Sequence, residues 1–222
     1  MMIREIQFLI GKEALIEWRN RHALNGILLY LASTIFICYL SLRSQGQYIG
    51  SNLWNALFWI IILFSAINAV LKSFITLSPG RLLYYYTLAR PESIILSKII
   101  YNSILLAAIG LIGASFYSLV LGNPVNNTGL FILTIFMGAC SLASILTLIS
   151  GIAAKASNST TLMAVLSFPV ILPVLLLIIR LTQNAIEGME FSVCGERILA
   201  LAALNIIALT MSYILFPYLW KN

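Results

Sequence analysis

The residue types that usually carry catalysis or bind metals are scarce and scattered in this sequence. Histidine occurs once, as His22, and the three cysteines, Cys38, Cys140 and Cys194, show no CxxC spacing. A metal site needs several such ligands close together, and a lone histidine at the entrance of an apolar segment is typical of an interfacial residue. The patterns GxSxG of serine hydrolases and HExxH of zinc proteases are both missing. The sequence therefore predicts no catalytic residues and no metal site.

An energy source within the chain is also missing. The single Gly-Lys pair, Gly11-Lys12, lacks the upstream glycine and the following Ser or Thr of a phosphate-binding loop. Ion-coupled transporters usually keep ionisable side chains inside the membrane, whereas the apolar segments of this chain hold none away from their ends. If the protein takes part in active transport, we expect another polypeptide to hydrolyse the ATP.

The composition indicates a membrane protein. Of the 222 residues, 61% are hydrophobic and 9% are charged, which is more apolar surface than a soluble core of this length can bury. Charge-free runs of about 20 residues locate the membrane spans. Six runs qualify, at 23–42, 53–71, 99–121, 129–151, 159–180 and 198–219. We therefore predict an all-α polytopic membrane protein with six transmembrane helices, forming one domain over residues 1–222.

The basic residues predict the side on which the chain ends lie. An even number of spans puts both termini on one side, and only Arg43, Arg180 and Arg197 of the 13 basic residues fall on the other. Because Lys and Arg accumulate in cytoplasmic loops, we predict that both termini are cytoplasmic. The net charge of +6 then reflects this topology and attraction to anionic membrane lipid, and requires no nucleic acid as a partner.

Residues 1–22 are expected to form an amphipathic interfacial helix on the cytoplasmic membrane surface, because apolar side chains are mixed there with both signs of charge. A plain extension of the first span into water is the alternative. We interpret the tryptophans near span ends as anchors among the lipid headgroups: Trp18, Trp54, Trp59 and Trp220. The asparagines within the spans cannot titrate and are expected to form interhelical hydrogen bonds: Asn55, Asn68, Asn102 and Asn205.

Two further patterns concern the packing and bending of the spans. Small residues recur in the third and fourth spans, among them Gly110 and Gly138, and should allow close helix approach. In the fifth span, Pro169 and Pro173 leave two carbonyls without helical donors, so the helix should bend there. The bend is either a static kink or a point at which the helix flexes.

The main polar interruption runs from Lys72 to Lys98, between the second and third spans. Ser78-Pro79-Gly80 is a turn signal, and the stretch from Arg81 to Leu88 suits a short helix. Pro91 suits an early position of the following helix. We interpret residues 72–98 as a cytoplasmic loop through which an external ATPase moves the spans. A surface loop lying on the headgroups through its tyrosines is the alternative.

The order of Gly80, a short helix, Pro91 and then Lys98 resembles the cytoplasmic loop of ABC-type-2 exporter permeases. More specifically, nearly all of the chain resembles the cytochrome c maturation protein B (CcmB) family, the membrane subunit of the so-called haem exporter. Length, six spans, loop order and the fifth-span stretch LMAVLSFPVILPVLLLI support this resemblance. Two features depart from it: Leu82 and Leu83 occupy the place of an acidic residue in many members, and KASNS at 155–159 replaces a basic-Gly-Gly element.

The resemblance implies a permease subunit of the bacterial inner membrane that works with a cytoplasmic ATPase (CcmA-like). Its other partners would be the haem-handling membrane proteins CcmC and CcmD and the haem chaperone CcmE, and it could form a homodimer. ATP would bind to the ATPase subunit, and haem is the possible cargo. The expected ATPase-coupling residues are Gly80, Arg81, Tyr84, Tyr85, Tyr86, Arg90, Pro91 and Lys98.

Alternative functions remain open at this point. The chain could be a type-2 permease for a drug, lipid or polysaccharide, or a scaffold that holds haem-handling proteins without transporting anything. Direct haem binding is not favoured, because the external loops lack histidine and the tryptophan-rich signature of CcmC is absent. The sequence assigns no role to the polar external residues of the last loop: Glu187, Glu190, Cys194 and Glu196.

Overall fold

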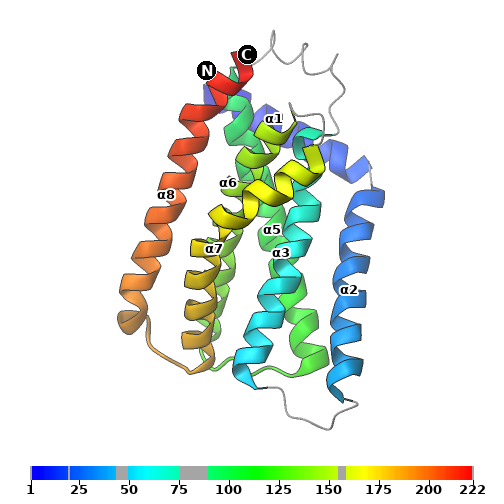
Figure 1. Cartoon of the computed structure of the whole chain (residues 1–222), viewed down its shortest axis with the longest axis vertical. Coiled ribbons are helices and arrows are strands. Elements are labelled where there is room, and N and C mark those ends of the chain that lie inside the picture. The colour runs from blue at the N-terminus through cyan, green and yellow to red at the C-terminus, as the bar shows by residue number, and fades with distance from the viewer. Residues whose placement is uncertain (1, 20, 44–49, 76–89, 155–158, 222) are drawn as a thin grey trace.

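The computed structural model describes residues 2–19, 21–43, 50–75, 90–154 and 159–221, and these ranges are almost entirely helical (Figure 1). The helices are α1 (Met2–Arg19), α2 (Arg21–Arg43), α3 (Ser51–Ile75), α5 (Pro91–Leu121), α6 (Thr128–Ala153), α7 (Ser159–Ile186) and α8 (Phe191–Lys221). Six of the described helices, α2 to α8, are long and apolar enough to cross a membrane. The predicted fold class and the six predicted spans are therefore confirmed.

The six long helices stand side by side, and α1 lies across the end of the bundle at which both chain termini are found (Figure 1). This is the end that the basic residues assign to the cytoplasm, and it is called the cytoplasmic end below. Helix α6 is central, because it packs against α3, α5, α7 and α8. Helix α1 packs mainly against α5.

Glycine allows the close approach of α5, α6 and α3. A Cβ atom at Gly110 would lie 2.8 Å from the Cγ2 atom of Ile135, and one at Gly138 would lie 3.0 Å from the Trp59 ring. Both glycines are buried inside the bundle, as expected from the small-residue pattern. In a membrane, where apolar side chains gain little from leaving lipid, such close contact is the main source of helix association.

We expect Gly110→Ala to destabilise the protein by about 1–3 kcal/mol, because the added methyl overpacks the contact with α6. Gly195→Ala in α8 is the matched control, since its Cβ would meet nothing within 4 Å. Unfolding of both purified variants in mixed micelles measures the difference. Equal stability of the two variants would show that the contact between α5 and α6 can adapt.

A cluster of aromatic rings fills the half of the bundle away from the cytoplasmic end. Trp54 stacks on Phe58 at a centroid distance of 5.7 Å and meets Tyr117 edge-on at 4.9 Å. Its indole N–H donates to the Gly122 carbonyl, and its own carbonyl accepts from the Tyr117 hydroxyl, both at 3.0 Å. Trp59 is also buried and donates to the Thr182 hydroxyl at 2.9 Å. The interpretation of Trp54 and Trp59 as headgroup anchors is therefore wrong, because both rings pack inside the protein.

Asparagine side chains connect the helices at several levels. The Asn55 side chain donates to the carbonyl of Ile179, and Asn102 donates to the Thr147 hydroxyl, each at 2.8 Å. Asn205 donates to the Met137 carbonyl at 3.3 Å. These contacts confirm the expected interhelical role for three of the four asparagines, whereas Asn68 is exposed.

Candidate coupling site and membrane pocket

The predicted coupling residues fall in two groups. Gly80, Arg81, Tyr84, Tyr85 and Tyr86 lie outside the described residues, as does the expected short helix from Arg81 to Leu88. Arg90, Pro91 and Lys98 are described, and they occupy the start of α5. The described part of the predicted coupling site is therefore the start of α5, where the cytoplasmic loop joins this helix.

Arg90 and Pro91 form the start of α5 in the way that the sequence predicts. Arg90 is exposed and extended, with φ −69° and ψ 140°, and Pro91 takes the first helical position. A residue before proline avoids the helical region, and proline at the first position loses no intrahelical hydrogen bond. The Arg90 carbonyl accepts the amide hydrogen of Ile94 at 3.1 Å. The loop thus joins α5 through a fixed backbone geometry.

Lys98 lies inside the protein. Its side chain is only 5% exposed, and its Nζ atom lies 3.2 Å from Glu13 Oε1 of α1. Glu13 also lies 3.5 Å from the Nζ atom of Lys12. Lys98 therefore differs from the other expected coupling residues, because its amino group is directed at α1 and is not displayed at the surface for an ATPase.

A second polar contact joins the same two helices one turn nearer the loop. The Ser93 hydroxyl donates to Glu5 Oε2 at 3.0 Å. Between the two polar contacts, the buried side chain of Leu9 packs with Ile94, Ile95 and Ile99 of α5. The cytoplasmic end of α5 is therefore held against α1 by apolar packing flanked by two charged contacts.

Glu5, Glu13 and Ser93 are not among the residues that the sequence predicts for this site. Glu5, Leu9 and Glu13 stand four residues apart, a spacing that places them along one face of a helix. That spacing is a usable signal of a shared contact, whereas the expectation for residues 1–22 is an interfacial helix on the membrane surface. In the structure this face is turned toward α5, whereas Phe8 and Trp18 of α1 are 76% and 71% exposed.

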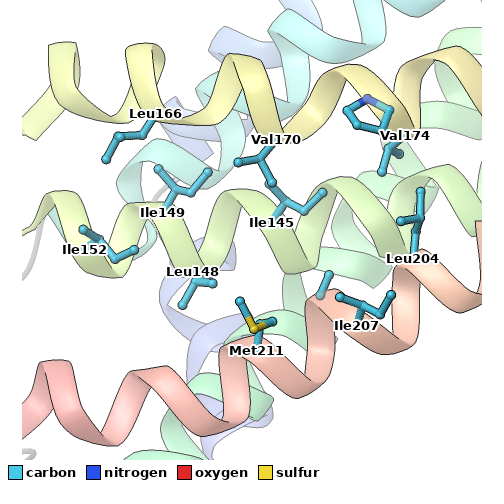
Figure 2. Close-up of a pocket in the computed structure, with 12 residues that line it drawn as sticks. Ile145, Leu148, Ile149, Ile152, Leu166, Val170, Val174, Leu204, Ile207 and Met211 are labelled. Carbon is cyan, nitrogen blue, oxygen red and sulfur yellow. The ribbon is translucent and has the colours of Figure 1, made fainter.

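An apolar pocket of about 470 Å³ lies between α6, α7 and α8, in the part of the bundle toward the cytoplasmic end. Figure 2 shows Leu166, Val170 and Val174 of α7 on one side, four residues of α6 next to them, and Leu204, Ile207 and Met211 of α8 opposite. The described residues that line the pocket are Ile145, Leu148, Ile149, Ile152, Leu166, Val170, Pro173, Val174, Leu204, Ile207, Ala208 and Met211.

The pocket offers little to a charged ligand. Among the lining residues that the structure describes there is no charged side chain, and the sulfur of Met211 is their only side-chain heteroatom. Haem carries two propionate groups, and an unpaired carboxylate in such a site is strongly unfavourable. The pocket is therefore suited to hydrocarbon.

Pro169 and Pro173 lie inside α7, which continues through both of them. Figure 1 shows that α7 runs obliquely near the cytoplasmic end and then upright toward the other end, and Pro173 lines the pocket. Helix α7 is thus bent between these two parts.

Two of the polar external residues, Cys194 and Glu187, make local contacts. Cys194 is buried in the first turn of α8, where the Asn184 side chain donates to its sulfur at 3.2 Å. Glu187 accepts a hydrogen bond from Gln183 at 2.9 Å. Within the described part of the chain, no three or more His, Cys, Asp or Glu side chains gather in a way that could hold a metal ion.

Six described helices that are long and apolar enough to cross a membrane define a class, that of multi-pass membrane proteins. The sequence matches the family model described as CcmB protein over residues 4–218. The chain therefore belongs to the CcmB family, which places it in c-type cytochrome biogenesis as a transporter membrane subunit. Among individually curated proteins, none matches the chain.

Proposed function

We propose that this chain is the membrane subunit of an ABC-type complex that handles haem for c-type cytochrome maturation in the bacterial inner membrane. The observation that carries the proposal is the CcmB family match over residues 4–218 of a chain with six membrane-crossing helices. The chain is not itself the enzyme in this proposal. ATP is bound and hydrolysed by a separate CcmA-like subunit.

The placement of charge supports an external energy source. In the described spans the charged side chains lie near helix ends: Glu92 and Lys98 in α5, Arg180 in α7, and Glu196 and Arg197 in α8. A proton or ion relay needs ionisable groups along the membrane interior. With none at mid-span, ATP hydrolysis on the cytoplasmic side is the better candidate.

The coupling step in this proposal uses the loop before α5. Gly80, Arg81 and the tyrosine triplet Tyr84 to Tyr86 contact the ATPase, and Arg90 and Pro91 pass the movement into α5. Arg90 is exposed at the end of the loop and is suited to contact a partner directly. Lys98 is buried, so its part is to transmit movement within this chain and not to touch the ATPase.

Haem itself is held by partners in this proposal. The described lining of the pocket does not provide the basic side chains that propionates require, and Met211 is its only side chain that could offer an axial ligand to iron. CcmC-like and CcmD-like membrane proteins therefore hold the haem, and ATP hydrolysis releases a haem-loaded CcmE-like chaperone. A homodimer of this chain would provide one membrane subunit for each subunit of an ATPase dimer.

We further propose that Pro169 and Pro173 let α7 flex beside the pocket. Replacing both by alanine restores two amide hydrogens to the helix, so we expect a more stable protein that matures less cytochrome c. Haem-stained c-type cytochrome and thermal stability in detergent measure the two effects. Pro217→Ala in α8, also a proline within a helix, is the control and should leave maturation unchanged. Normal maturation in the Pro169/Pro173 double variant would identify the bend as a static kink.

A permease for an apolar cargo, such as a lipid or a drug, is the second candidate, and the hydrocarbon-suited pocket is the observation that favours it. A polysaccharide is not favoured, because the lining offers it almost no hydrogen-bond partners. Co-purification with the tagged chain separates the candidates. A CcmA-like ATPase and haem absorbance support the first, whereas bound lipid without haem-handling partners supports the second.

A further inference from the structure

A small apolar core at the cytoplasmic end is separate from the main core of the bundle. It consists of Leu9 from α1, three isoleucines from the first turns of α5, and Phe216 from the last turns of α8, which is 2% exposed. The isoleucines are Ile94, Ile95 and Ile99. Three segments that are far apart in the sequence are therefore packed together where the cytoplasmic loop enters α5.

Two charged contacts fix the register of α1 on this core. Glu13 pairs with the buried Lys98, and Glu5 accepts a hydrogen bond from Ser93. A buried ion pair adds little stability compared with apolar packing, but separating its members leaves a charge in a poorly solvating environment. The pair therefore opposes sliding of α1 along α5 more strongly than it stabilises the contact.

The position of this pair along α5 matters for movement. Ser93 and Lys98 lie two and seven residues after Pro91, within the first turns of a helix that continues unbroken to Leu121. A displacement of Pro91 by the loop must carry Lys98 with it, because a helix of this kind is stiff over a few turns. Glu13 and α1 then follow.

We propose that α1, the first turns of α5 and the last turns of α8 move as one transmission unit, and that the Glu13–Lys98 pair locks α1 into it. This inference rests on the proposed ATPase-coupled function and extends it by naming Glu13, Lys98, Glu5 and Ser93 as positioning residues. The unit transmits a movement of the cytoplasmic loop to three helices. Helix α1 therefore takes part in transmitting this movement and is not only a membrane-surface helix.

The double variant Glu13→Leu/Lys98→Met tests whether the ion pair locks α1 to α5 or only contributes to their packing. Apolar replacement of a buried pair often leaves a protein as stable as before, so a merely structural role would be satisfied. We expect normal assembly with the ATPase, but a loss of cytochrome c maturation of about tenfold, within the range of 5–150-fold typical of coupling between sites. The charge-swapped variant Glu13→Lys/Lys98→Glu should recover most of it.

The matched control is Glu196→Gln, which removes one carboxylate from an exposed position at the opposite end of the bundle. It should leave maturation unchanged. Normal maturation in the apolar double variant would overturn the proposal. A charge-swapped variant that assembles with the ATPase but does not mature cytochrome c would also overturn the proposal. This second outcome counts even if the apolar double variant fails to assemble.

A crosslink tests the joint movement directly. The substitutions Glu5→Cys and Ser93→Cys, in a chain whose native cysteines are replaced by alanine, allow a short bifunctional thiol reagent to join the two positions in place of their hydrogen bond. If α1 and α5 move together, the crosslinked complex keeps its ATP-dependent release of the haem-loaded chaperone. Loss of release upon crosslinking would show that the helices must separate. A wild-type complex without ATP-dependent release would instead refute the proposed function itself.

Discussion

Replacing Tyr84, Tyr85 and Tyr86 together by serine is expected to abolish c-type cytochrome maturation while the chain remains inserted in the membrane. Aromatic side chains are the commonest hot spots of protein interfaces, and truncating one costs about 2 kcal/mol or more of binding. Residues 81–91 contain no carboxylate, so we expect the tyrosines and nearby basic residues to supply the contact. Haem-stained cytochrome c, normalised to the amount of inserted chain, measures the effect.

Two controls define what the triple serine variant reports. The corresponding triple phenylalanine variant keeps the rings and should retain most of the maturation. Tyr213→Ser removes an exposed ring from α8 and should have no effect. Full maturation in the triple serine variant would refute the role of the tyrosines as the ATPase contact and would favour a loop that lies on the headgroups.

Replacing Trp54 by alanine is expected to give the largest loss of stability, about 3–5 kcal/mol, because a large buried ring is removed from a packed core. Trp54 is 1% exposed and belongs to a cluster with Phe58, Tyr117 and Phe131. Its removal also leaves the Gly122 carbonyl without its indole donor. The free energy of unfolding in mixed micelles measures the effect.

Trp18→Ala is the matched control for this prediction. The Trp18 side chain is 71% exposed on α1, and substitutions at exposed positions usually change stability by about 0.5 kcal/mol or less. The two variants together test whether the tryptophans differ in role. A Trp54→Ala variant as stable as Trp18→Ala would restore the interpretation of Trp54 as a headgroup anchor.

The fold could be predicted from sequence because its main determinants are local. Membrane spans are set by the length of charge-free apolar runs, and the turn at Gly122 to Asn127 interrupts the longest of them. Because the number of spans is even, both termini are expected at the same end of the bundle. The early position of Pro91 in α5 could also be predicted, since the constraint that proline puts on the backbone is local.

The details that sequence could not supply depend on which helices are neighbours. Trp54 lies near a span end whether it faces lipid or α5, and only the packing of α3 against α5 and α6 decides between the two. Lys98 similarly precedes an apolar run, as a residue at the membrane surface would. Its pairing with Glu13 depends on α1 folding back over α5, which no local pattern specifies. The coupling residues from Gly80 to Tyr86 stay predictions.

The most direct test of the central claim is the rate of ATP hydrolysis by the CcmA-like ATPase, measured with and without this chain in lipid vesicles. We predict that the chain stimulates hydrolysis several-fold, and that the triple serine variant at Tyr84 to Tyr86 does not. An ATPase rate that is the same with and without the wild-type chain would contradict the account. The chain would then be a scaffold and not a membrane subunit driven by ATP.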